Sequence, residues 1–141
     1  MSPSGMGRGN PRSMPDYTLV NLMEVEDSVA GRAEGIEGRF GRGPMGARDI
    51  GVSHWRYAPG FRAGMGHRHR EQEEAYLVIS GSGELLLDDR VIELRQWDLV
   101  RVAPAVVRAF AAGDDGLEVV AVGGPKPEGG DGEPTEVSWP G

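Results

Sequence analysis

The sequence contains no cysteine. A chain without cysteine cannot form disulfides, thiolate metal sites or a thiol nucleophile. It also lacks a hydrophobic run of membrane-spanning length, and its first residues lack the apolar centre of a signal peptide. The 15 basic residues are outnumbered by 22 acidic ones, so the net charge is -7. Nucleic acids and anionic membranes attract basic surfaces, so we expect a cytoplasmic protein with no nucleic-acid or membrane partner.

Glycine and proline, by contrast, are abundant, with 23 and 10 of the 141 residues. So many turn-forming residues exclude a fold made mainly of long helices, and the length suits one domain. The composition divides the chain into a flexible arm at residues 1–16, a folded body at residues 17–122 and an acidic Gly/Pro-rich tail at residues 123–141.

The folded body contains short β-prone segments separated by turn residues. The predicted strands are Ile50–Tyr57, Ala75–Ile79, Glu84–Leu87, Val91–Leu94, Leu99–Val102, Val106–Phe110 and Leu117–Val122. Their spacing is typical of an all-β sandwich or barrel. A short helix is predicted near Leu22–Ser28. Because Ala75–Ile79 is apolar on both faces, both must be buried. A closed barrel buries one face inside, and a partner subunit or the N-terminal segment can bury the other.

Two of the three histidines stand at positions 67 and 69. Residues i and i+2 of a strand point to the same side, so His67 and His69 can bind one metal ion together. Glu74 follows a charged turn and begins the strongest predicted strand. Glu73 is the alternative carboxylate, but it has the opposite parity. Two histidines and one carboxylate form a facial triad with open positions, which suits Fe, Mn, Ni, Cu or Zn.

These residues resemble the first motif of the cupin superfamily, with His67, His69, Glu74 and Gly81 in the motif positions and Gly60 one residue upstream of its usual place. Residues 97–108 resemble the second motif. The resemblance implies a double-stranded β-helix, the cupin jelly-roll barrel of two antiparallel sheets, which usually forms a homodimer. Cupins include dioxygenases, decarboxylases, isomerases and sugar-binding proteins. The resemblance therefore implies a small-molecule ligand without naming the reaction, and nothing in the sequence predicts an organic cofactor.

The second motif departs from the family pattern. Trp97, Ala103 and Ala105 replace its usual Gly, Pro and Gly, and Arg108 occupies the position of the fourth metal ligand. A guanidinium stays protonated and does not ligate a metal here. Two alternatives follow. In the first, the triad holds a metal and Arg108 is a catalytic residue that binds an anionic substrate. In the second, Arg108 pairs with Glu74 in a metal-free binding module.

Strand parity also predicts the residues of the substrate pocket. Tyr76 and Val78 share the parity of Glu74, and Phe110 shares that of Arg108. His54 is a further pocket candidate if its strand faces inward. The sequence thus predicts a small cupin that acts on a small anionic organic molecule in a dioxygenase-like or isomerase-like reaction.

Overall fold

The structure is a computed structural model that describes residues 16–141. The predicted flexible arm, residues 1–16, lies outside the described residues except for Asp16. The elements in chain order are η1 (Leu22–Glu24), β1 (Ile36–Phe40), α2 (Arg42–Met45), β2 (Gly51–Tyr57), β3 (Met65–His69), β4 (Glu74–Leu87), β5 (Arg90–Leu94), β6 (Leu99–Val102), β7 (Arg108–Gly123) and β8 (Gly132–Glu136). In this part of the chain, no helix is long and apolar enough to cross a membrane.

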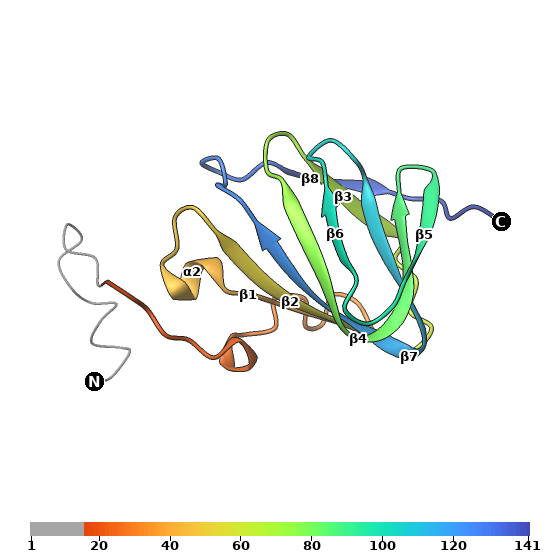
Figure 1. Ribbon diagram of the computed structural model, residues 1–141, viewed down its shortest axis with the longest axis horizontal. Coiled ribbons are helices and arrows are strands. Elements are labelled where there is room, and N and C mark those ends of the chain that lie inside the picture. The colour runs from red at the N-terminus through yellow and green to blue at the C-terminus, as the bar shows by residue number, and fades with distance from the viewer. Residues whose placement is uncertain (1–15) are drawn as a thin grey trace.

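Two long strands, β4 and β7, organise the fold (Figure 1). They pair antiparallel over most of their length, and each also pairs with shorter strands. β4 contacts β5 and β6, whereas β7 contacts β2 and β3. All eight strands therefore belong to one curled antiparallel sheet. The predicted all-β jelly-roll barrel is confirmed, with its two sheets continuous through β4 and β7.

The predicted break after Ile79 is a bulge within β4 rather than the end of a strand. The pairing of β4 with β7 shifts register between Val78 and Ser80 and again between Gly81 and Gly83. Gly81 has a positive φ of 76°, and a Cβ there would collide with the Gly116 carbonyl oxygen. Glycine therefore allows the two strands to bend together without separating.

The core occupies part of the barrel interior and leaves the remainder hollow. Alternate residues of β4 and β7 fill it, including the fully buried Val78, Leu85 and Val119. Tyr57, Tyr76 and Phe110 belong to this core and also line a large cavity. Their rings are in contact, with centroid distances of 5.6 Å for Tyr57–Phe110 and 5.1 Å for Tyr76–Phe110. This aromatic layer therefore separates the packed core from the hollow part.

Short elements complete the two edges of the sheet. β1 pairs with β2, and β8 pairs with β3, although neither β1 nor β8 is among the predicted strands. The helix predicted near Leu22–Ser28 is a single 3-10 turn, Leu22–Glu24, whose first turn is capped by the Asn21 side chain. The edge formed by β3 and β8 is the one that carries the candidate site.

Candidate metal centre

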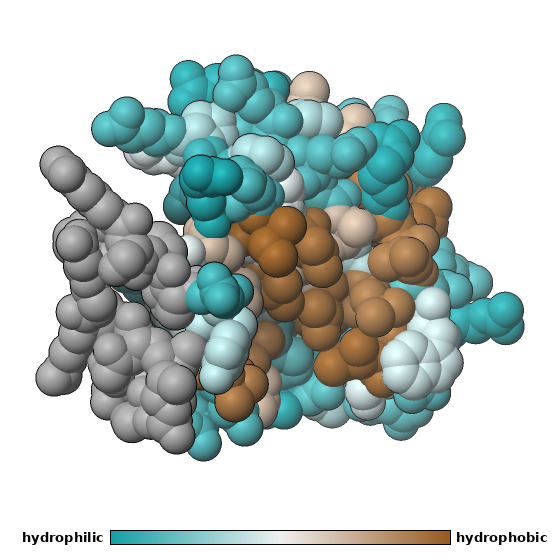
Figure 2. All heavy atoms as spheres, turned by 60° about the vertical axis from the view of Figure 1, so that its left-hand side comes forward, coloured by the Kyte–Doolittle hydropathy of each residue, from teal (hydrophilic) through white to brown (hydrophobic). Residues whose placement is uncertain are grey.

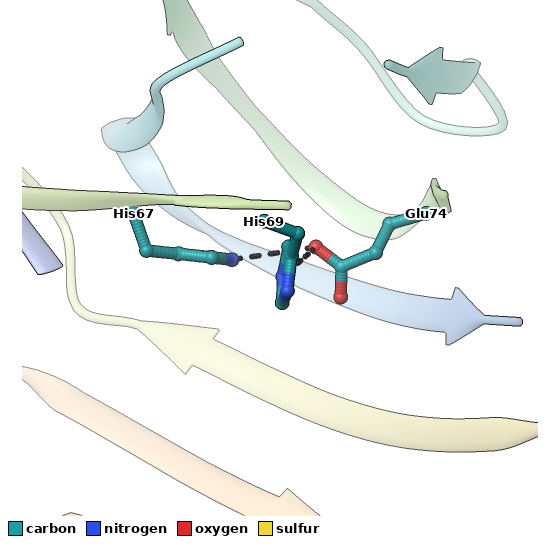
Figure 3. A group of neighbouring side chains, drawn as sticks. All are labelled: His67, His69 and Glu74. Atoms are coloured by element: carbon teal, nitrogen blue, oxygen red, sulfur yellow. Dashed lines mark hydrogen bonds and ion pairs between the residues drawn. The ribbon is translucent and has the colours of Figure 1, made fainter. Parts of the chain in front are cut away.

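The three predicted metal ligands come from the facing ends of two strands. His67 and His69 belong to β3, and Glu74 is the first residue of β4. Alternation along β3 directs both imidazoles to one side, and residues 70–73 turn the chain back so that the carboxylate of Glu74 faces them (Figure 3). The structure thus brings together the residues that the spacing selects.

Their donor atoms lie close to one another. Glu74 Oε1 is 3.3 Å from His67 Nε2 and 3.1 Å from His69 Nε2, and all three atoms lie within 4.8 Å of one another. The imidazole planes are nearly perpendicular, at 89°. A transition metal about 2.0–2.2 Å from each donor keeps its ligands roughly 3–4 Å apart, so small side-chain adjustments make room for the ion. The donor set therefore fits a divalent transition metal.

Glu74 is held in its ionised form by several neighbours. Burial would raise the pKa of this carboxyl, but hydrogen bonds from His67 and Tyr76 and the charges of the imidazoles lower it to about 2. The Tyr76 hydroxyl donates to Glu74 Oε1 at 2.5 Å. Burial and the adjacent carboxylate raise the pKa of Tyr76, so the phenol keeps its proton. Glu74 is thus a negatively charged carboxylate, able to act as a metal ligand, at any physiological pH.

Arg108 lies at the same end of the barrel, directly across the sheet from His67. Its side chain is completely buried, and its Nε is 3.9 Å from Glu74 Oε1 without a hydrogen-bond partner in the described part of the chain. The other two nitrogens donate to main-chain carbonyls of its own turn, those of Val102, Ala103 and Pro104, at 3.2–3.4 Å. The guanidinium is therefore anchored by the backbone and presents only Nε to the carboxylate.

The site forms part of the wall of a cavity of about 940 Å³. The triad lies on one side, and the aromatic wall is formed by Phe40, Trp55, Tyr57, Tyr76 and Phe110. Three further cationic side chains line the cavity, those of Arg42, Arg108 and Lys126. The lining carboxylates, Glu74 and Asp131, both have partners. The cavity thus combines an apolar surface with positive charge that its carboxylates do not fully balance.

Two predicted pocket residues lie outside this cavity wall. Val78 faces inward like Tyr76, but it is packed within the core and does not line the cavity. His54 alternates with Ser53 and Trp55, which line the cavity, so its imidazole turns to the outer face of β2. There it is buried 4.0 Å from a Glu118 oxygen, and burial lowers its pKa. His54 therefore faces away from the cavity that the triad borders.

The alternative carboxylate, Glu73, also points elsewhere. Its side chain is 60% exposed and accepts a hydrogen bond from Arg101 on β6 at 3.0 Å. Adjacent residues at a strand start face opposite sides, so Glu74 takes the inward position and Glu73 the outward one. The structure thus places Glu74, the carboxylate that parity favours, beside the two imidazoles.

Sequence reasoning missed Asp131, which lies in the acidic tail. Its side chain is 1% exposed, and its Oδ1 accepts a hydrogen bond from His69 Nδ1 at 2.9 Å. Burial would raise the pKa of Asp131, but hydrogen bonds from Glu71, His69 and Gln72 keep it well below its usual range. Nothing in the Gly-Gly-Asp-Gly sequence around Asp131 predicts a strand or a ligand contact. The pairing of β8 with β3 reveals this contact.

Fold and site together define a β-barrel protein with a candidate two-histidine, one-glutamate metal centre. Residues 53–123, just over half of the chain, match the family model described as Cupin domain. The chain therefore belongs to the cupin family, as the two motifs predict. A search of the curated proteins found no match.

Solved structures of similar fold have diverse descriptions. A cupin protein from Bacteroides fragilis has 21% identity and a TM-score of 0.66, covering 81% of this chain and 88% of its own. The polyketide cyclase RemF from Streptomyces resistomycificus has 18% identity and a TM-score of 0.67, covering 87% of each chain. A sugar phosphate isomerase of the cupin superfamily from Silicibacter pomeroyi has 20% identity and a TM-score of 0.64, covering 77% of this chain and 76% of its own. At these identities, the similarity establishes the fold and not a reaction.

Proposed function

We propose that the protein binds one divalent transition metal through His67, His69 and Glu74. The observation that carries this proposal is the convergence of two imidazole nitrogens and one carboxylate oxygen within 4.8 Å at a cavity wall. This ligand set suits Fe, Mn, Ni, Cu or Zn. When bound, such an ion supplies Lewis-acid or dioxygen chemistry to a substrate. The chain's own part is to fix the ligands and to shape the cavity beside them.

We further propose a small anionic organic substrate. The cavity of about 940 Å³ has room for a molecule of this class, and its aromatic wall offers apolar contact. Arg42 and Lys126 supply positive charge for a carboxylate, phosphate or enolate group. Arg108 adds a fixed positive charge, and both Arg42 and Arg108 already donate from their terminal nitrogens to main-chain carbonyls. An isomerase-like or dioxygenase-like reaction suits such a site.

The alternative is a metal-free binding module in which Arg108 neutralises Glu74. It is supported by the buried Arg108 Nε, which lies 3.9 Å from Glu74 Oε1 and has no other partner among the described residues. In that case Glu74 would organise the two imidazoles and Tyr76 through hydrogen bonds alone. The cavity would then bind an anion without transforming it.

Metal content measured on untagged protein separates the two alternatives. We expect about one equivalent of metal in the wild type and almost none in Glu74→Gln, which keeps the side-chain shape but removes the charge. Glu73→Gln is the matched control, because the neighbouring carboxylate faces Arg101 on the outside. Circular dichroism melts show whether each variant is folded.

Wild-type protein that stays metal-free after anaerobic reloading with each candidate ion would overturn the metal proposal in favour of the binding module. Equal metal content in wild type and Glu74→Gln would remove Glu74 from the ligand set. Loss of metal in Glu73→Gln alone would mean that Glu73, and not Glu74, is the carboxylate ligand.

We also propose that a second copy of the chain covers the outer face of the barrel. Strand pairing places Leu77 between Leu99 and Val120, all outside the core, and Leu99 is 69% exposed. Figure 2 shows a broad hydrophobic area of the surface bordered by polar residues. Leu99→Glu should convert a dimer into a monomer in light scattering, whereas an unchanged mass would place any dimer interface elsewhere.

A further inference from the structure

The acidic tail supplies a contact to the candidate metal centre from outside the cupin motifs. After β7, the chain crosses the end of the barrel and pairs as β8 with β3, so that Gly132 lies opposite His69. Gly129 and Gly130 have positive φ values of 79° and 77°, which allows the tight turn before Asp131. The turn directs the Asp131 carboxylate inward, and its side chain is 1% exposed.

Both oxygens of this carboxylate are fully engaged. Oδ1 accepts from His69 Nδ1 at 2.9 Å, and Oδ2 accepts from the backbone N–H groups of Glu71 at 2.6 Å and Gln72 at 2.8 Å. All three donors belong to the short segment from His69 to Gln72, which ends just before Glu74. The single carboxylate therefore anchors one ligand side chain and also the loop that sets the position of the next ligand.

We propose that Asp131 is a positioning residue of the metal site, an inference that rests on the proposed function. Its hydrogen bond keeps the proton of His69 on Nδ1 and directs the Nε2 lone pair toward the position between the three ligands. Its two bonds to the loop hold residues 71 and 72 in place. Carboxylates in this relation to a ligating histidine fix its orientation and strengthen it as a donor.

His67 and His69 differ in how firmly their imidazoles are held. The His67 side chain is 40% exposed, and within residues 16–141 its Nδ1 has no hydrogen-bond partner. The His69 side chain is 10% exposed and is held at Nδ1 by Asp131. Asp131 therefore fixes one side of the site, while His67 retains freedom to adjust to an ion. Binding energies are reciprocal, so an ion on His69 also stabilises the docked tail.

The test compares metal affinity in three full-length variants. Asp131→Ala removes all three contacts, and Asp131→Asn keeps the size but replaces one acceptor oxygen with an NH₂ group. Glu133→Gln is the matched control, because this neighbouring β8 carboxylate is half-exposed and contacts Arg68 outside the site. The probes are Zn²⁺ and Co²⁺ in competition with a chelator. We expect roughly 10–100-fold weaker binding in Asp131→Ala, a smaller loss in Asp131→Asn and less than about twofold in Glu133→Gln.

A spectroscopic readout on metal-free protein tests the contact itself. The Nδ1–H proton of His69 should give a downfield, slowly exchanging NMR signal that disappears in Asp131→Ala and persists in Glu133→Gln. If Asp131→Ala does not fold, Asp131→Asn provides both measurements.

The failures of the two proposals are distinguishable. Wild-type protein that binds neither probe ion overturns the metal site and, with it, the role of Asp131. If wild type binds the ions and both Asp131→Ala and Asp131→Asn have the same metal affinity as wild type, only the role of Asp131 is overturned. That role is likewise overturned if the His69 Nδ1–H signal is unchanged in both variants.

Discussion

The two cupin motifs meet at one end of the barrel, but they use their side chains differently. In the first motif, His67, His69 and Glu74 direct their donor atoms toward one another. In the second, Arg108 pairs across the sheet with His67 but directs two of its nitrogens to carbonyls of its own turn. The backbone arrangement of the family is thus retained. The first motif carries three candidate metal ligands, whereas the arginine of the second motif is bound by the carbonyls of its own turn.

The main chain of the second motif satisfies the buried guanidinium of Arg108. Ala103 and Pro104 supply carbonyls that accept from Arg108, and a buried guanidinium needs such acceptors because burial of an unsatisfied donor is costly. The positive charge also lies beside Glu74, where it opposes a bound cation and favours the free carboxylate. Arg108 therefore stabilises the turn and, under the metal proposal, opposes a cation at the triad at the same time.

Replacement of Arg108 by methionine should separate these two effects, and it should give the largest change among the variants that test this contrast. Met fills similar space but removes the charge and all donors. The free energy of unfolding should fall by about 2–4 kcal/mol, because three carbonyls lose their donor. Metal affinity should rise by about tenfold or more, because the ion no longer faces a nearby cation. Urea unfolding and chelator competition provide the two measurements.

Arg101→Met is the control for Arg108→Met, since Arg101 is an exposed arginine of the same motif on strand β6. It should change stability by less than about 0.5 kcal/mol, as most surface substitutions do. If Arg108→Met instead weakens metal binding, Arg108 supports the centre, and the contrast between the motifs is wrong.

Much of this arrangement could be predicted from the sequence, because it depends on local parity. Alternation put His67 and His69 on one side of a strand and distinguished Glu74 from Glu73. The predicted strand positions agree with β2, β5 and β6 within a residue or two. The spacing could not show that β4 and β7 continue through glycine-rich segments, because a bulge and a turn have the same composition.

Contacts between distant segments could not be predicted from local patterns. Asp131 reaches His69 only because β8 adds to the edge of β3, and Gly132–Glu136 contains a proline and few β-prone residues. The direction of the Arg108 nitrogens likewise depends on the path of the 103–107 turn. Long-range pairing and turn geometry, rather than residue type, decide both features.

Tyr76 offers a smaller and sharper test of the first motif, because its hydroxyl contacts the ligand Glu74 directly. Tyr76→Phe removes this hydrogen bond to a charged group. In metal-free protein, prepared with a chelator, the free energy of unfolding should fall by about 1–2 kcal/mol at pH 7. Tyr57→Phe is the matched control, since the Tyr57 hydroxyl lies in the same aromatic layer and makes no hydrogen bond within the described residues. Tyr57→Phe should lower the free energy of unfolding by less than Tyr76→Phe does.

The pH dependence of the Tyr76→Phe effect follows from the lowered pKa of Glu74. A carboxyl with a pKa of about 2 in the folded state and 4.5 as its ordinary value stabilises the fold fully above pH 4.5. That stabilisation is lost as the pH falls toward 2, because the unfolded chain binds the proton first. Without the hydroxyl, the pKa of Glu74 lies closer to 4.5, so less stabilisation remains to be lost. The difference in unfolding free energy between wild type and Tyr76→Phe should therefore stay constant at any pH above the folded-state pKa of Glu74 in the variant, which lies between about 2 and 4.5, and narrow as the pH falls from there toward 2. A difference that stays constant down to pH 2.5 in urea unfolding would mean that Tyr76 acts through packing and not through the ionised carboxylate.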